Sequence, residues 1–257
     1  MRKYIPHILI ISFIFLLAPT AHVALHAGES EDARGEVRRN PDDASAHNNL
    51  GIAYYYTGKY QEAIKSYKQA LRIDPDDAGV HAILGLAYCD SGKYEEAIES
   101  YKQAIRIDPG LAGAHVGLGT AYGKSGKWKE AIESCKQAIR IDPDDATAHY
   151  NLGLAYGKLG KHQEEIESYK QAIRIDPDYA NAHNNLGCTY GELGKYKEAI
   201  ESWKQAIRID PDYANAHKNL GYAYLDLNKK SYALEQYKIL KKLDTELANE
   251  LFDKIYE

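Results

Sequence analysis

A regularly spaced histidine is the first candidate in this chain for metal binding or proton transfer. One histidine recurs every 34 residues, at His47, His81, His115, His149, His183 and His217. Imidazole binds transition metals and changes charge near neutral pH, so a metal-binding or pH-sensing ladder is one interpretation. Equivalent residues of successive packed helices lie about 8–10 Å apart, whereas zinc binds a histidine nitrogen at about 2.0–2.1 Å. We therefore expect each imidazole to fill the space between neighbouring repeats.

Two glycine-rich sequences come close to nucleotide-binding loops without meeting their requirements. Residues 119–125 have three residues between the glycines, where a phosphate-binding loop needs four. Residues 117–119 begin a dinucleotide-type pattern, but Tyr122 stands where the third glycine belongs. The sequence contains no metal-binding histidine pair with a glutamate, no Cys-x-x-Cys and no Gly-x-Ser-x-Gly. We expect no catalytic residues, no cofactor, no metal and no small-molecule substrate, and thus no enzyme.

The composition is that of a folded, acidic protein. The 257 residues include 32 Lys and Arg against 37 Asp and Glu, a net charge of −5 at pH 7. Nucleic-acid-binding domains are usually basic, so nucleic acid is not expected as a partner. The 22 tyrosines far outnumber the 3 phenylalanines and 2 tryptophans, which indicates that one short pattern has been copied many times.

The first 27 residues are expected to direct export. Arg2 and Lys3 precede an apolar run at residues 8–18, and small, neutral residues follow as far as Ala27. This is the layout of a secretory signal peptide, with cleavage predicted after Ala27. The run is shorter than the ~20 apolar residues that span a membrane. We expect an exported protein, periplasmic or otherwise extracytoplasmic. The alternative is an uncleaved membrane anchor formed by residues 5–24. No other association with a membrane is expected.

A pattern of 34 residues repeats through the rest of the chain. Lys-Gln-Ala begins at Lys68, Lys102, Lys136, Lys170 and Lys204. Within one period, apolar or small residues are spaced i, i+3, i+4, i+7, which predicts one face of a helix, at His47, Leu50, Gly51 and Tyr54. Gly58 interrupts the pattern, and a second helix is predicted from Tyr60 until Pro75 ends it. The interrupting glycine recurs in every copy except the last, where Asn228 tolerates the same left-handed conformation.

On these residues the chain resembles the tetratricopeptide repeat (TPR) family. The family pattern W-x2-L-G-x2-Y, A-x3-F and P appears as His47, Leu50, Gly51, Tyr54, Ala63, Tyr67 and Pro75. The six copies cover residues 44–77, 78–111, 112–145, 146–179, 180–213 and 214–247. The resemblance implies an all-α fold, a right-handed α-solenoid of six TPR helix-turn-helix hairpins with a C-terminal capping helix.

Short segments are expected to cover the two ends of the array. Residues 28–43 are expected to form a linker and a degenerate cap helix, the remnant of a lost copy. At the other end, Leu247, Leu251 and Ile255 are spaced four residues apart, which predicts a capping helix over the last hairpin. Residues 248–257 would be the end of that helix.

Individual copies depart from the pattern. Copy four has Glu165 where the other copies have alanine, in a column expected to face Gly153, so this copy is expected to pack more loosely or to be shifted. Cys135 replaces a core tyrosine and is expected to be buried. Cys89 and Cys188 lie more than two repeats apart, so no intramolecular disulfide is expected.

In the TPR family, ligands usually lie in a concave groove lined by the first helices, and the resemblance implies the same here. We map this groove onto first-helix columns that vary between copies. The predicted peptide-binding residues are Asn48, Ile52, Tyr55, Ala82, Leu86, Cys89, Val116, Thr120, Tyr150, Leu154, Asn184, Cys188, Lys218 and Tyr222. Those in copies two to four are mostly apolar, and Gly123, Gly157 and Gly191 beside them are expected to let a ligand backbone approach. Neutral drift between near-identical copies is the alternative explanation.

The predicted function is a non-enzymatic scaffold that binds a protein or peptide segment. Many TPR domains grip a C-terminal carboxylate with Lys and Asn, but Lys218 is the lone lysine of its column, so an extended, partly apolar peptide is the better expectation. The scaffold would support assembly of an extracytoplasmic complex. One alternative is a substrate-recruiting subunit for a separate enzyme such as a glycosyltransferase. Another is a self-associating structural array.

Overall fold

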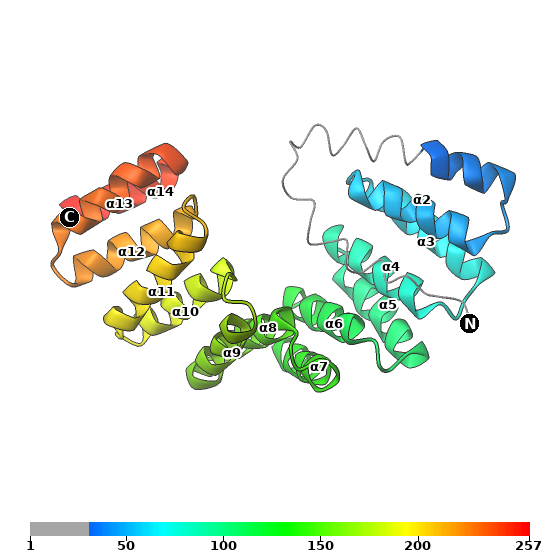
Figure 1. Ribbon diagram of the computed structural model, residues 1–257, viewed down its shortest axis with the longest axis horizontal. Coiled ribbons are helices and arrows are strands. Elements are labelled where there is room, and N and C mark those ends of the chain that lie inside the picture. The colour runs from blue at the N-terminus through cyan, green and yellow to red at the C-terminus, as the bar shows by residue number, and fades with distance from the viewer. Residues whose placement is uncertain (1–30) are drawn as a thin grey trace. The chain divides into compact units, whose positions relative to one another are not determined.

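The structure, a computed structural model, describes residues 31–257, and all regular structure in this range is helical (Figure 1). The predicted signal peptide lies outside these residues. Residues 31–39 form a short helix. The remaining helices are α2 (Ala44–Tyr56), α3 (Tyr60–Ile73), α4 (Ala78–Asp90), α5 (Tyr94–Ile107), α6 (Ala112–Lys124), α7 (Trp128–Ile141), α8 (Ala146–Lys158), α9 (His162–Ile175), α10 (Ala180–Glu192), α11 (Tyr196–Ile209), α12 (Ala214–Asp226), α13 (Lys230–Leu243) and α14 (Thr245–Tyr256). The expected all-α fold of helical hairpins is confirmed.

The chain divides into two compact units, residues 1–109 and 110–257. In the first, the described part is the helix at residues 31–39 and the hairpins α2–α3 and α4–α5. The second contains the hairpins α6–α7, α8–α9, α10–α11 and α12–α13, followed by α14. Figure 1 shows the two helices of each hairpin lying side by side. Among the described residues, no helix is long and apolar enough to cross a bilayer.

The turn between the two helices of a hairpin depends on a residue with positive φ. Gly58 has a φ of 72°, and the N–H of Lys59 donates to the carbonyl of Tyr54 at 2.9 Å. Asn228 takes the same place in the last hairpin with a φ of 57°, and the N–H of Lys229 donates to the carbonyl of Tyr224 at 2.7 Å. The expectation that asparagine would preserve this turn is confirmed.

In the first five hairpins a side chain of the second helix packs against a glycine of the first, and in the last hairpin Leu251 of α14 packs against Gly221. A Cβ atom added to Gly187 would lie 2.7 Å from the indole nitrogen of Trp203, so this position has no room for a side chain. In copy three the partner of Gly119 is Cys135, which is buried as expected. Burying these apolar groups supplies the main favourable free energy of each hairpin.

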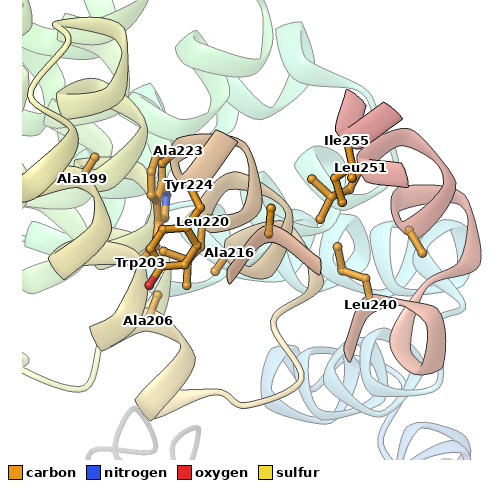
Figure 2. Packing of buried hydrophobic residues seen from close by; sticks show 12 residues of the cluster. Ala199, Trp203, Ala206, Ala216, Leu220, Ala223, Tyr224, Leu240, Leu251 and Ile255 are labelled. Carbon is orange, nitrogen blue, oxygen red and sulfur yellow. The ribbon is translucent and has the colours of Figure 1, made fainter. Parts of the chain in front are cut away.

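The last hairpin is covered by α14, as expected for a capping helix. Figure 2 shows Leu251 and Ile255 of α14 near Leu240 of α13, and all three are buried. The carboxylate of Asp244 accepts the N–H groups of Glu246 and Leu247 at 3.0 Å, which caps the N-terminus of α14. The final apolar face of the array is therefore covered.

Copy four corrects the expectation for Glu165. The side chain that packs against Gly153 is Tyr169, and the Glu165 carboxylate lies beside Gly157 instead. Glu165 is only 8% exposed, and its Oε2 lies 3.2 Å from Nδ1 of His162. Its backbone N–H donates to the carbonyl of Lys161 at 3.0 Å, the distance found at the equivalent alanine of copy one, so the first turn of the helix keeps its hydrogen bond. The absence of a side chain at residue 157 provides the space.

Candidate peptide-binding face

In the second unit, asparagine side chains link the first helices of successive hairpins. Nδ2 of Asn151 donates to Oγ1 of Thr120 at 3.1 Å, and Nδ2 of Asn185 donates to the hydroxyl of Tyr150 at 3.1 Å. Asn219 likewise lies 3.3 Å from Sγ of Cys188. Each asparagine therefore reaches a predicted site residue of the preceding copy.

Sequence reasoning missed these three asparagines. They occupy one column of the first helix, next to the first varying column, and copy one has Asn49 there as well. Four asparagines among six copies were a usable signal, because an amide in a helix needs a partner when a neighbouring helix covers it. The column holds Ile83 and Gly117 in copies two and three, so the links follow only where asparagine is present.

Tyr150 and Leu154 form a partly exposed surface on α8, called here the apolar wall. The ring of Tyr150 lies 4.9 Å from that of Tyr179 and 5.8 Å from that of Tyr169. Both Tyr150 and Leu154 are half-buried against a core that includes Leu186. Burial raises the pKa of Tyr150, and the hydrogen bond from Asn185 opposes that rise. The two side chains are held in place while part of their surface stays exposed.

A cavity of about 300 Å³ lies between α10 and α12 and includes two predicted site residues. It is lined by Cys188, Gly191, Glu192, Tyr196, Trp203, Asn219, Tyr222, Ala223 and Asp226. Burial raises the pKa of Cys188 and also that of Tyr222. The cavity thus combines aromatic side chains with two carboxylates, a combination that the sequence prediction did not include.

The three glycines expected to admit a ligand backbone have another role, so that expectation is wrong. A Cβ on Gly123 would meet the ring of Trp128 at 3.2 Å, and one on Gly191 would meet the ring of Trp203 at 3.2 Å. Beside Gly157 the same space holds the Glu165 carboxylate. Large side chains of the second helices occupy the space, because glycine on the first helix leaves room for them.

Two further predicted residues of the second unit already have partners. Nζ of Lys218 lies 3.0 Å from Oε2 of Glu250, which pairs the lysine of this column. Asn184 is buried, and its backbone carbonyl accepts the indole N–H of Trp203 at 3.1 Å. Val116 is half-buried on α6. Lys218 and Asn184 are therefore both engaged in contacts within the protein.

In the first unit, the predicted residues fall into separate environments. Asn48 is half-buried, and its Oδ1 has no hydrogen-bond partner among the described residues. Ile52 lines a cavity of about 440 Å³ beside the helix at residues 31–39. The hydroxyl of Tyr55 donates to the carboxylate of Asp90. The other three residues are partly or well exposed on α4: Ala82, Leu86 and Cys89.

The recurring histidines bind backbone carbonyls. Nε2 of the imidazole lies 2.9–3.1 Å from the carbonyl oxygen of the proline six residues earlier, in the pairs His47–Pro41, His81–Pro75, His149–Pro143, His183–Pro177 and His217–Pro211. The expected role between neighbouring repeats thus has a specific hydrogen bond. Over residues 31–257, no group of three His, Cys, Asp or Glu side chains is arranged to hold a metal.

Residues 16–250 match the family described as the cilia and flagella-associated protein 70 C-terminal domain. The structure of MamA is similar, with 32% identity and a TM-score of 0.59 over 64% of this chain and 96% of that chain. YrrB, described as a TPR protein with an unusual peptide-binding site, has 24% identity and a TM-score of 0.57 over 73% and 96%. Pseudomonas aeruginosa PilF has 19% identity and a TM-score of 0.72 over 82% and 97%. No curated protein matches the sequence.

These similarities indicate a protein–protein interaction scaffold. TPR proteins bind protein or peptide partners and are generally non-catalytic. The six hairpins, the glycine or asparagine turns and the family match agree. The chain belongs to the tetratricopeptide repeat family, in the group described as the cilia and flagella-associated protein 70 C-terminal domain.

Proposed function

We propose that this protein is an adaptor that binds an extended, partly apolar peptide segment along the first helices of its second unit. The observation that carries this proposal is the row of asparagine links, which joins the first helices and binds the hydroxyl of Tyr150, while Leu154 packs half-buried against the same core as Tyr150. A preformed binding surface pays less ordering entropy when a ligand binds. An apolar side chain of the peptide would pack on Leu154, and polar groups of its backbone would meet the amides.

YrrB offers support of a general kind. It has a similar fold, and its description names a peptide-binding site. Extended peptides gain affinity from side chains that enter pockets at intervals along a surface. The cavity between α10 and α12 is one such pocket. Tyr150 and Leu154 lie in α8, the first helix of the preceding hairpin.

Selection from a displayed library of random peptides tests the proposal. The full chain should enrich peptides with apolar residues, and Leu154→Asp should abolish their binding because a carboxylate replaces the apolar contact. Leu159→Asp is the matched control, since Leu159 lies in the same hairpin, is 36% exposed and is outside the predicted site. Circular dichroism should show equal helix content in all three proteins. Enrichment of no peptide, or equal binding by the native and Leu154→Asp proteins, would contradict the proposal.

Export to an extracytoplasmic space is a separate part of the proposal. It rests on the charged, apolar and small-residue order of residues 1–27. Mass determination of the protein from its native source should give a chain that begins at Gly28. A chain that retains Arg2 and Lys3 and fractionates with membranes would favour the anchor at residues 5–24 instead.

Self-association is a second candidate function, favoured by an exposed aromatic group on the last two helices. The ring of Phe252 lies 5.3 Å from that of Tyr237 and 4.6 Å from that of Tyr256. Phe252 is 40% exposed and Tyr256 is 60% exposed, so the group presents apolar surface to solvent. Sedimentation equilibrium should show a mass that rises with concentration and returns to the monomer value in Phe252→Glu. A monomer at all concentrations would eliminate this candidate.

A further inference from the structure

The charge at the ends of the first helices changes sign within the second unit. The last residue is Lys124 in α6 and Lys158 in α8, but Glu192 in α10 and Asp226 in α12, and all four are exposed. The C-terminus of a helix carries partial negative charge, which favours a cation there and disfavours a carboxylate. The negative charges of Glu192 and Asp226 therefore interact unfavourably with the C-termini of the helices that they end. Residues that break a local rule often belong to functional sites.

Both carboxylates belong to the 300 Å³ cavity between α10 and α12. The aromatic side chains of this cavity are Tyr196, Trp203 and Tyr222. Because Gly191 has no side chain, it does not cover the ring of Trp203. Figure 2 shows Trp203 near Leu220 and Ala223 of α12, and all three belong to one buried cluster.

The two lysines near the cavity form their direct ion pairs with other carboxylates, although Lys254 also attracts Asp226 at longer range. Lys218 is paired with Glu250 at 3.0 Å, and Lys254 is paired with Glu257 at 2.6 Å. Within the part of the chain that the structure describes, neither Glu192 nor Asp226 has an ion-pair partner within 4.0 Å. The cavity consequently combines aromatic side chains with two negative charges that lack a direct counter-ion.

Building on the peptide-binding role proposed above, we propose that this cavity receives the Lys or Arg side chain of the bound peptide. The long aliphatic stem of such a side chain packs on aromatic rings, while its charged group stays near carboxylates and water. Ligand cavities usually measure roughly 300–1,000 Å³, so this one, at the small end, suits one side chain better than a whole metabolite. The peptide then carries its basic residue toward α10 and α12, away from Lys124 and Lys158.

The experiment uses peptides selected on the full-length native protein. These peptides should be enriched in Lys or Arg, and the double variant Glu192→Lys with Asp226→Lys should bind them at least about tenfold more weakly. The same variant should bind a peptide in which Glu replaces the basic residue better than the native protein does. The matched control is Glu198→Lys with Glu235→Lys, which changes the total charge equally at two exposed carboxylates outside the cavity.

The outcomes separate this inference from the proposed function. Selected peptides whose binding is lost in Leu154→Asp, but which are not enriched in Lys or Arg, would overturn the cavity assignment alone. Equal weakening by the cavity variant and the control variant would overturn it too, because the effect would then be one of total charge. Basic peptides that lose affinity in the cavity variant but bind Leu154→Asp normally would support the cavity and contradict the apolar wall. Failure to select any peptide would overturn both.

Discussion

The Nε2 atom of His217 lies 3.0 Å from the carbonyl oxygen of Pro211, six residues earlier in the chain. Pro211 follows the second helix of copy five, and His217 lies in the first helix of copy six, so the bond connects neighbouring copies. A backbone carbonyl can only accept a hydrogen bond, so Nε2 must carry the proton. The pair His47–Pro41 has the same geometry, which indicates that the helix at residues 31–39 takes the place of a preceding second helix.

Removing this hydrogen bond should destabilise the last hairpin. His217 is 3% exposed, so His217→Phe keeps a ring in place but removes two hydrogen bonds, one to the Pro211 carbonyl and one between Nδ1 and Gln236. Hydrogen bonds of this kind contribute about 0.5–1.5 kcal/mol each to stability. Urea denaturation should show this loss, with a smaller one in His183→Phe because His183 is only half-buried. Unchanged stability in His217→Phe would show that the two bonds of this imidazole contribute nothing.

Gly157 and Glu165 should be energetically coupled. Glycine to alanine in a helix ordinarily adds about 1 kcal/mol of stability. In the native protein, however, a Cβ at residue 157 would collide with the Glu165 carboxylate, so Gly157→Ala should lower stability. In the Glu165→Ala background the same change should raise it. A double-mutant cycle measures the difference, expected at about 0.5–3 kcal/mol. Additive effects would mean that the carboxylate moves aside freely.

Alkaline pH should unfold the protein before its buried tyrosines ionise. Burial raises the pKa of Tyr179 to about 12 and raises that of Tyr169 further. The unfolded value is about 10. Because the folded pKa is the higher, the stabilisation is fully present below pH 10 and is lost as pH rises through the folded pKa. Tyrosinate absorbance from these residues should therefore appear together with the loss of helical circular dichroism. Ionisation of Tyr169 while the helix signal is intact would contradict this.

The Cys135 thiol should react only after unfolding. Cys135 forms no disulfide, and burial raises the pKa of its thiol to about 12. Thiolate is the reactive form, and at pH 8 the folded protein holds almost none at this residue. Alkylation with iodoacetamide followed by mass spectrometry should leave Cys135 unmodified in the native protein and modify it in denaturant. Equal labelling rates in the two conditions would show that the hairpin opens readily.

Features that depend on neighbours along one helix or one turn could be predicted from the sequence. The hairpins, the turn at Gly58 and the substitute turn at Asn228 follow from helical periodicity and from the backbone preferences of glycine and asparagine. The burial of Cys135 followed from its column. Such features recur with the 34-residue period, so each copy supplied a test of the same pattern.

Contacts between columns were decided by the tertiary structure. The partner of Glu165 is Gly157 and not Gly153, and the glycines expected to admit a ligand are covered by second-helix side chains such as Trp128. The asparagine links and the pairing of Lys218 with Glu250 also join residues more than 30 positions apart. The repeat, its helices and its turns could be predicted from the amino-acid sequence, because they depend on interactions within a few residues. The contacts between columns of different helices depend on how the helices pack. The rotation and spacing of one helix against the next are set by the whole interface.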